Sequence, residues 1–98
     1  TDIANRPGTP IRATANGVVK FAGGKPGYGK TIVIDHGYGL ETWYAHARTL
    51  IAKKDDPVRR GQKIALMGST GRSTAPHVHY EVRVHGIPVD PLTYILEE

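Results

Sequence analysis

The chain has no cysteine, and this absence removes several kinds of chemistry at once. A disulfide framework, a thiolate zinc site and a cysteine nucleophile are all excluded, so any metal must be held by histidine and carboxylate. No apolar run approaches the roughly 20 residues that span a bilayer. The sequence starts at Thr1-Asp2-Ile3 without an initiator methionine and without a recognisable signal peptide. We therefore expect a mature or excised piece of a longer protein.

The chain is also short and has few acidic residues. Its 98 residues suffice for one domain, which we assign to residues 1–98. A formal net charge of +4 suggests an anionic environment such as a cell-wall polymer, although an ordinary basic surface explains the charge equally well. The densest basic group, Lys53-Lys54 and Arg59-Arg60, is interrupted by Asp55-Asp56. We expect no nucleic-acid partner.

Glycine and proline are abundant, with 12 and 7 residues, and they divide the chain into short segments rich in Val, Ile, Thr and Tyr. This pattern predicts an all-β fold, a mostly antiparallel sandwich or barrel-like sheet. We expect Asn16-Gly17 to form a hairpin turn, and Asp90-Pro91 to start a short C-terminal helix that ends at Leu96. The expected strands are residues 9–15, 17–22, 30–36, 40–47, 63–67, 77–84 and 87–89.

Two other functions fit the sequence poorly. The turn-rich stretch 56–65 is typical of small carrier domains for lipoyl or biotin groups, but no hairpin tip offers the lysine that such a carrier modifies. The glycine-rich loop 23–29 could suggest a phosphate cradle. It lacks the Gly-Lys-Ser/Thr ending and a helix after it, which excludes a nucleotide site of that kind.

The chemistry is concentrated in His77-Val78-His79. Residues two apart on a strand point to the same side, so these two imidazoles make a natural start for a metal site. Alone the pattern is weak, since two solvent-facing histidines explain it equally well. His46 on a second strand and Asp2 near the N-terminus add imidazole and carboxylate, which are the ligand types that zinc hydrolases use beside an open position for water.

The chain resembles the M23 metallopeptidases that cut bacterial peptidoglycan, of the lysostaphin and LytM type. The resemblance covers nearly the whole length and follows the family's order and spacing. It is carried by residues 1–4, 8–13, 15–19, 27–29 (Gly-Tyr-Gly), 42–46 (Thr-Trp-Tyr-Ala-His), 58–62, 68–73 and 77–82 (His-Val-His-Tyr-Glu-Val). It implies the lysostaphin-type fold, a duplicated hybrid motif whose sheet forms the floor of a substrate groove.

The resemblance also implies roles for individual residues. Asp2 and His79 would bind Zn²⁺, while His77 and His46 would be catalytic histidines that position the water and stabilise the tetrahedral intermediate. Strand alternation puts Tyr44 on the face of His46, so we expect Tyr44 to line the groove and bind substrate. Arg72 and Ser73, in the loop before His77, are further candidates for substrate binding.

Other aromatic and histidine residues have structural interpretations. Strand alternation turns Trp43 away from Tyr44 and turns Tyr80 away from His79, so we expect both in the core. His36 and His85 lie beside turn glycines, and we expect neither to bind metal.

The sequence departs from the family pattern at one point. The family's His-x-x-x-Asp element requires a histidine four residues before Asp2, whereas the sequence starts one residue before it. We expect truncation to account for this, because the other site positions are filled as the active pattern requires. The alternative is a degenerate, catalytically inactive member.

These observations predict a zinc-dependent endopeptidase that hydrolyses peptide cross-links or stem peptides of peptidoglycan, in the periplasm or outside the cell. The alternative is an inactive LytM-type domain that regulates cell-wall amidases. The expected partners are peptidoglycan and other domains of the parent protein.

Overall fold

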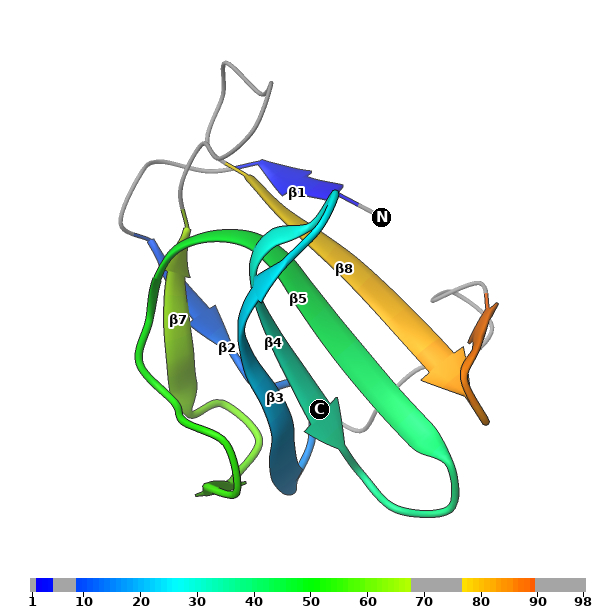
Figure 1. Ribbon diagram of the computed structural model, residues 1–98. Coiled ribbons are helices and arrows are strands. Elements are labelled where there is room, and N and C mark those ends of the chain that lie inside the picture. Colours follow the sequence, from blue (N-terminus) through cyan, green and yellow to red (C-terminus); the bar gives the residue numbers. More distant parts are fainter. Residues whose placement is uncertain (1, 5–8, 68–76, 90–98) are drawn as a thin grey trace.

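The computed structural model describes residues 2–4, 9–67 and 77–89, with side chains for 9–67 and 80–89. Every regular element in these ranges is a β-strand (Figure 1), which confirms the predicted all-β fold. The helix predicted at the C-terminus lies outside the described residues. In the part of the chain that the structure describes, no helix is long and apolar enough to cross a membrane.

The strands form one antiparallel sheet with a branch. Its main path runs β1-β8-β5-β4-β3-β6, β9 pairs with β8, and β7 joins β5 to β2. The strands of the described residues are β1 (Asp2–Ala4), β2 (Pro10–Arg12), β3 (Gly17–Lys25), β4 (Gly29–Asp35), β5 (Leu40–Leu50), β6 (Pro57–Val58), β7 (Lys63–Met67), β8 (His77–Val84) and β9 (Ile87–Val89).

The long strand β5 belongs to both parts of the sheet. Its first half, from Leu40 to Ala45, pairs with β8, and its last part, from Ala47 to Leu50, pairs with β7. Because β5 pairs first with β8 and then with β7 along its length, the sheet curls into a half-barrel (Figure 1). The change of partner occurs at His46.

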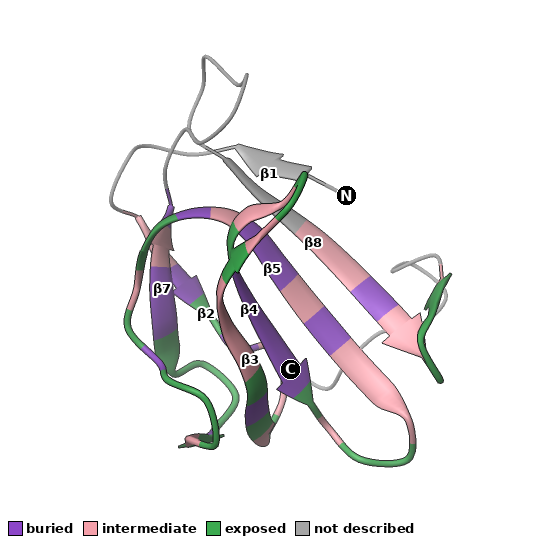
Figure 2. Ribbon diagram, in the orientation of Figure 1, coloured by how far each residue is buried: buried purple, intermediate pink, exposed green. Residues whose placement is uncertain are grey.

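The apolar core fills the inside of this curl. The centre of β4, Thr31 to Ile34, is buried at every position, as expected for a strand covered on both faces. Figure 2 shows the buried positions on β4, β5 and β7, with exposed residues at the turns. The core cluster consists of Ile11, Ala13, Val19, Ile32, Ile34, Tyr44, Ala47, Ala52, Val58, Ile64, Ala65 and Met67.

A chain of hydrogen bonds crosses this core. His36 Nδ1 donates to the Asn16 carbonyl (2.7 Å), and His36 Nε2 lies 2.7 Å from Thr42 Oγ1. Thr42 in turn donates to the Tyr44 hydroxyl (2.8 Å), which lies 2.9 Å from Thr14 Oγ1. Burial raises the pKa of the Tyr44 phenol above its ordinary value, so the group stays neutral and keeps its proton for this chain. Both ring nitrogens of His36 form hydrogen bonds within the protein, which agrees with the structural role predicted for this residue.

The hairpin predicted at Asn16-Gly17 is wrong. The segment before it pairs with β7, in the register Ile11↔Ala65, while β3 pairs with β4 and β6. A Cβ at Gly17 would lie 2.6 Å from the Asp35 carbonyl oxygen, so glycine is needed here for a close approach of two backbones. Two adjacent segments that read as a hairpin therefore belong to different parts of the sheet.

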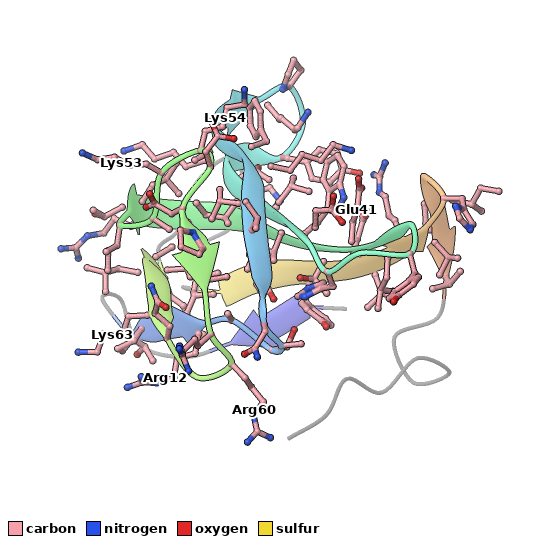
Figure 3. All side chains as sticks on the ribbon, turned by 90° about the horizontal axis from the view of Figure 1, so that it is seen from below. Arg12, Glu41, Lys53, Lys54, Arg60 and Lys63 are labelled. Atoms are coloured by element: carbon pink, nitrogen blue, oxygen red, sulfur yellow. The ribbon has the colours of Figure 1, made fainter. Side chains whose placement is uncertain are left out.

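Basic side chains surround the half of the molecule built from β2, β6 and β7. Figure 3 shows Arg12, Lys53, Lys54, Arg60 and Lys63 spread around this half, with Glu41 on the other side of the molecule. All five are exposed. The distribution is broad, as the scattered sequence positions suggest, and it forms no compact binding patch.

Replacement of Thr42 by valine tests the hydrogen-bond chain. Thr42 is fully buried, and the change keeps its shape but leaves His36 Nε2 without its partner and Tyr44 with one partner fewer. We expect the free energy of unfolding to fall by about 1–3 kcal/mol, as measured by urea denaturation. Thr49→Val, at an exposed position of the same strand, should change it by less than about 0.5 kcal/mol. Equal effects of the two variants would contradict the role of the chain.

Candidate functional site

Strand β8 pairs with a segment that is distant from it in the sequence. In the antiparallel pair β1–β8, Asp2 lies opposite His79 and Ala4 lies opposite His77. On the other side of β8, Ala45 of β5 lies opposite His79. The two predicted zinc ligands are thus direct register partners, and the residue before His46 is the next neighbour across the sheet. The predicted roles of these residues stay predictions.

His46 occupies a β-bulge at the branch point of the sheet. Between the pairs Lys30↔Ala47 and Ile32↔Tyr44, β5 has one residue more than β4. His46 has φ = 61°, in the left-handed region that few non-glycine residues adopt, and its N–H donates to the Tyr28 carbonyl (2.8 Å). Bulges and backbone outliers of this kind cluster at functional sites, where they re-aim a side chain.

The bulge changes the position expected for Tyr44. Strand alternation predicts that Tyr44 and His46 share a face, but the extra residue breaks the alternation between them. Tyr44 is 2% exposed and belongs to the core cluster, where its ring packs against Tyr80 at a centroid distance of 5.5 Å. Tyr44 therefore packs on the core side, where it also lines a cavity together with Tyr80. Its predicted contact with substrate stays a prediction, and Tyr80 packs against the core as predicted. Arg72 and Ser73 lie outside the described residues.

Trp43 lies on the face of the sheet opposite the core, contrary to its predicted core position. The Arg83 guanidinium stacks over its ring at 3.7 Å, and Lys25 Nζ lies 5.1 Å from the ring centroid. The Tyr28 ring is tilted relative to the Trp43 ring, and the two ring centroids are 5.5 Å apart. The core face of this part of the sheet is already filled by Ile32, Ile34 and Tyr44, so the indole has aromatic and cationic neighbours instead of aliphatic ones.

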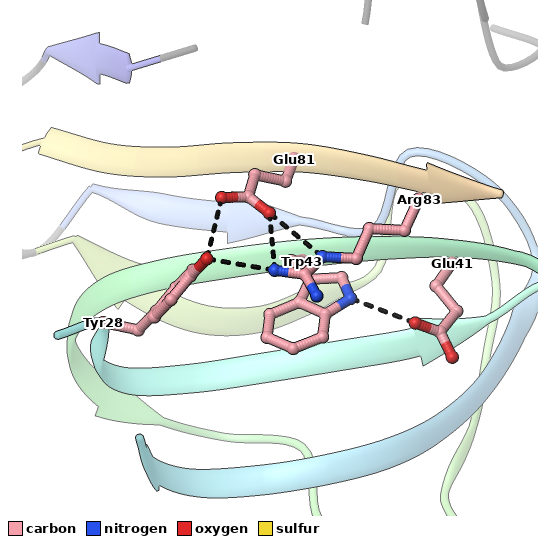
Figure 4. A network of polar contacts seen from close by, with 5 residues as sticks. All are labelled: Tyr28, Glu41, Trp43, Glu81 and Arg83. Atoms are coloured by element: carbon pink, nitrogen blue, oxygen red, sulfur yellow. Dashed lines mark hydrogen bonds and ion pairs between the residues drawn. The ribbon is translucent and has the colours of Figure 1, made fainter. Parts of the chain in front are cut away.

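A polar network extends from this tryptophan along β5 and β8 (Figure 4). Arg83 donates through Nε and Nη2 to Glu81 Oε2 (3.1 and 3.0 Å) and through Nη2 to the Tyr28 hydroxyl (3.0 Å). Tyr28 donates to Glu81 Oε1 (3.1 Å). The register pairs Trp43 with Glu81 and Glu41 with Arg83, which fixes all these groups on one face.

Glu41 closes the network at its other end. It accepts hydrogen bonds from Trp43 Nε1 (3.1 Å) and from Lys20. Partial burial alone would raise the pKa of the Glu41 carboxyl, but the hydrogen bonds from Lys20 and Trp43 outweigh it and hold the pKa below its ordinary value. The carboxylate is therefore ionised at neutral pH.

Tyr28, Glu81 and Arg83 were not among the residues singled out from the sequence. The sequence does indicate the position of Glu81 and Arg83, because alternation along the strand 77–84 places both on the face of His79. Tyr28 follows a turn glycine, and nothing in its local sequence indicates that its hydroxyl reaches β8.

The two residues predicted to bind the metal, Asp2 and His79, are of types that bind zinc. A carboxylate and an imidazole are hard and borderline ligands that zinc accepts readily, and Asp2 and His79 are paired in the sheet. No group of three potential ligand side chains occurs among the residues that the structure describes. The residues present fit two positions of a zinc site.

Comparisons with known proteins agree on one family. The family model described as "Peptidase family M23" matches residues 1–91. The DD-carboxypeptidase/endopeptidase Mpg of Neisseria meningitidis is 48% identical over 97% of this chain, which spans 22% of that protein. The murein hydrolase activator NlpD of Salmonella dublin is 44% identical over 96% of the chain, which spans 25% of it.

Solved structures of this kind share the fold. A zinc-containing peptidase from Vibrio cholerae has a TM-score of 0.90 and 42% identity, with 99% of this chain and 30% of that chain covered. The catalytic domain of lysostaphin from Staphylococcus simulans has a TM-score of 0.88 and 32% identity, with 98% and 77% covered. The predicted resemblance is confirmed, and with it the lysostaphin-type fold.

The network around Trp43 can be tested through its fluorescence, because the chain has one tryptophan. Arg83→Gln removes the cation over the indole and the charged partner of Glu81. We expect a change in the emission spectrum and a loss of about 1–2 kcal/mol in the free energy of unfolding. Arg48→Gln, at an exposed position of β5, should leave both unchanged. Identical emission in the Arg83→Gln and wild-type proteins would contradict the stacked geometry.

Proposed function

The chain belongs to peptidase family M23, and from this premise we propose that it is a zinc-dependent endopeptidase domain acting on bacterial peptidoglycan. Its substrates would be peptide cross-links or stem peptides, and its place of action the cell envelope. The chain spans about a fifth of the Mpg relative, so further domains of the parent protein would share in recognising the wall.

The observation that carries this proposal is the register of β8. Asp2 pairs with His79 on one side, and Ala45, the neighbour of His46, pairs with His79 on the other. Residues directly opposite one another in an antiparallel pair are close neighbours on one face. A carboxylate position, an imidazole position and a second histidine on a bulge therefore occupy three adjacent strands, and these are residue types that zinc hydrolases use.

The residues divide into two groups by role. Asp2 and His79 would hold the zinc, which when bound lowers the pKa of water toward neutral and polarises a scissile carbonyl. His77 and His46 would accept or donate protons beside it and stabilise the charge that develops on the carbonyl oxygen. The bulge at His46 supports this assignment, because it takes the histidine out of the alternation that buries Tyr44.

A second function is supported by the relative named as a murein hydrolase activator. Its identity of 44% is close to the 48% of the endopeptidase relative, so overall similarity does not separate the two. In this alternative the same fold binds and regulates cell-wall amidases without binding zinc.

Hydrolysis and metal content separate the two functions. We expect the protein, as its gene encodes it, to bind about one zinc per chain and to release peptide fragments from purified peptidoglycan in a chelator-sensitive manner. Zinc would be measured by atomic emission and fragments by chromatography. A well-folded protein with no zinc and no cleavage would overturn the peptidase proposal and favour the regulatory domain.

Substitutions should distinguish ligands from catalytic groups. His79→Ala and Asp2→Ala are expected to lose zinc and hydrolysis together. In the variant His46→Asn, the asparagine can adopt the left-handed backbone conformation of this position. We expect this variant to retain zinc while the hydrolysis rate falls by about 10²–10⁴-fold, the usual contribution of a general acid or base to the rate. His85→Ala, at the exposed β8–β9 turn, should change neither. Loss of zinc in His46→Asn would contradict the division of roles.

A further inference from the structure

The tip of the β3–β4 hairpin is built around Tyr28. Lys25 and Tyr28 close a four-residue turn, in which the Tyr28 N–H donates to the Lys25 carbonyl (3.0 Å). A proline follows Lys25, and the next residue, Gly27, has φ = 79°, which is the pattern of a type II turn. Gly29, on the other side of Tyr28, also has a positive φ of 70°. Two positions that favour glycine therefore fix the direction of the backbone on either side of the tyrosine.

Tyr28 connects this hairpin tip to two other strands. Its carbonyl accepts the N–H of His46 on β5 (2.8 Å). Its hydroxyl donates to Glu81 Oε1 (3.1 Å) and accepts from Arg83 Nη2 (3.0 Å), both on β8 (Figure 4). Its ring lies against Trp43, with the two centroids 5.5 Å apart. The side chain of Tyr28 is thus anchored on β8 and β5, while its main chain contacts the bulge.

The bulge depends on such a contact because the conformation of His46 is unfavourable. A non-glycine residue in the left-handed region persists only where its surroundings fix it, and His46 has φ = 61°. Ala45 and Ala47 are fully buried, so they anchor the chain on both sides of the bulge, but their methyl groups do not orient the peptide group between Ala45 and His46. The hydrogen bond from the His46 N–H to the Tyr28 carbonyl fixes that peptide group, and with it the direction in which the imidazole leaves the backbone.

We propose that Tyr28 is a positioning residue for His46. Its hydroxyl, held by Glu81 and Arg83, keeps the hairpin tip against β5 and β8. Its carbonyl then holds the bulge in the conformation that directs the imidazole. Tyr28 acts through His46 and needs no contact with the substrate or the metal. This inference rests on the proposed function, because it gives Tyr28 a part in the reaction that His46 would serve.

Tyr28→Phe tests this role, because it removes the hydroxyl but keeps the ring and the carbonyl. In the protein as its gene encodes it, the His46 N–H should exchange with solvent about 10-fold faster, since the hairpin tip loses a hydrogen bond to a charged group. Nuclear magnetic resonance measures this exchange. With a soluble cross-linked fragment of peptidoglycan as substrate, kcat should fall by about 10-fold, while KM and the zinc content stay unchanged. A lower kcat without faster exchange would overturn the role.

Tyr38→Phe is the matched control. Tyr38 lies at the β4–β5 turn and is fully exposed, so the loss of its hydroxyl should alter neither the exchange of the His46 N–H nor kcat. If the two tyrosine variants have equal effects, the general loss of a phenol hydroxyl explains them, and the positioning role of Tyr28 is wrong.

Gly27 supplies a second test that leaves the tyrosine intact. A Cβ at Gly27 or at Gly61 would meet no atom of a more distant residue within 4 Å, so alanine at either position adds only backbone strain, at φ values of 79° and 84°. Gly27→Ala should accelerate the exchange of the His46 N–H and lower kcat, as Tyr28→Phe does. Gly27→Asn, which tolerates this conformation, should restore both, and Gly61→Ala should alter neither. Equal losses in the asparagine and alanine variants of Gly27 would contradict the proposal.

The outcomes separate this inference from the proposed function. If the wild-type protein hydrolyses the fragment and Tyr28→Phe leaves kcat unchanged, the peptidase stands and the positioning role is wrong. A higher KM at unchanged kcat would also overturn the role, since it would indicate a direct contact of Tyr28 with substrate. If the wild-type protein does not hydrolyse the fragment but the His46 N–H still responds to Tyr28→Phe, the contact with the bulge stands and the peptidase is wrong. Should Tyr28→Phe fail to fold, as judged by circular dichroism, the Gly27 variants decide the outcome.

Discussion

The register of β8 is the constraint on which the rest of the site depends. This strand pairs with β1 and β5 at once, and those two pairings fix which residues meet Asp2, His77 and His79. Because the side chains of a strand alternate, a shift of one residue would move every one of these positions to the core face. On the core face, Val82, Tyr80 and Tyr44 hold the register by packing. On the opposite face, Arg83 holds it by stacking on Trp43 of β5. Packing on one face and charge on the other thus specify the same alignment.

The bulge at His46 is a second consequence of the same architecture. A strand that leaves one partner for another must change direction, and an extra residue in the left-handed conformation allows β5 to do so. Such a conformation costs of order 1–3 kcal/mol, which the buried residues on either side, Ala45 and Ala47, help to offset. The histidine is thus one of the few described non-glycine residues in the left-handed region. That placement is expected for a group that takes part in chemistry.

Much of the fold could be predicted from the sequence. The segments 63–67 and 77–84 were bounded correctly, because turn residues flank clear runs of apolar or alternating residues. The pairing of distant strands was harder to predict. Asn16-Gly17 has the local character of a hairpin, but Gly17 makes a close contact with β4 that only the folded chain reveals.

Local sequence was also insufficient to place some residues of the site. Alternation misplaced Tyr44, since a one-residue bulge leaves little trace in the sequence. Trp43 was expected in the core because its hydrophobicity gives no hint of the cations that stack on it.

Among the strands that the structure describes, β1 pairs with β8 and with no other strand, so it lies at an edge of the sheet. A strand at the edge of a sheet is held by one neighbour and detaches at lower free-energy cost than a central strand. If Asp2 is a ligand, every zinc ion bound also fastens this edge to the sheet, and the docking of β1 and the affinity for zinc become a single linked equilibrium. A scarcity of zinc would then leave β8 with unpaired N–H and C=O groups, open to an extended segment from another chain. Metal supply would in this way control both the chemistry of the groove and the surface that the sheet presents to its surroundings.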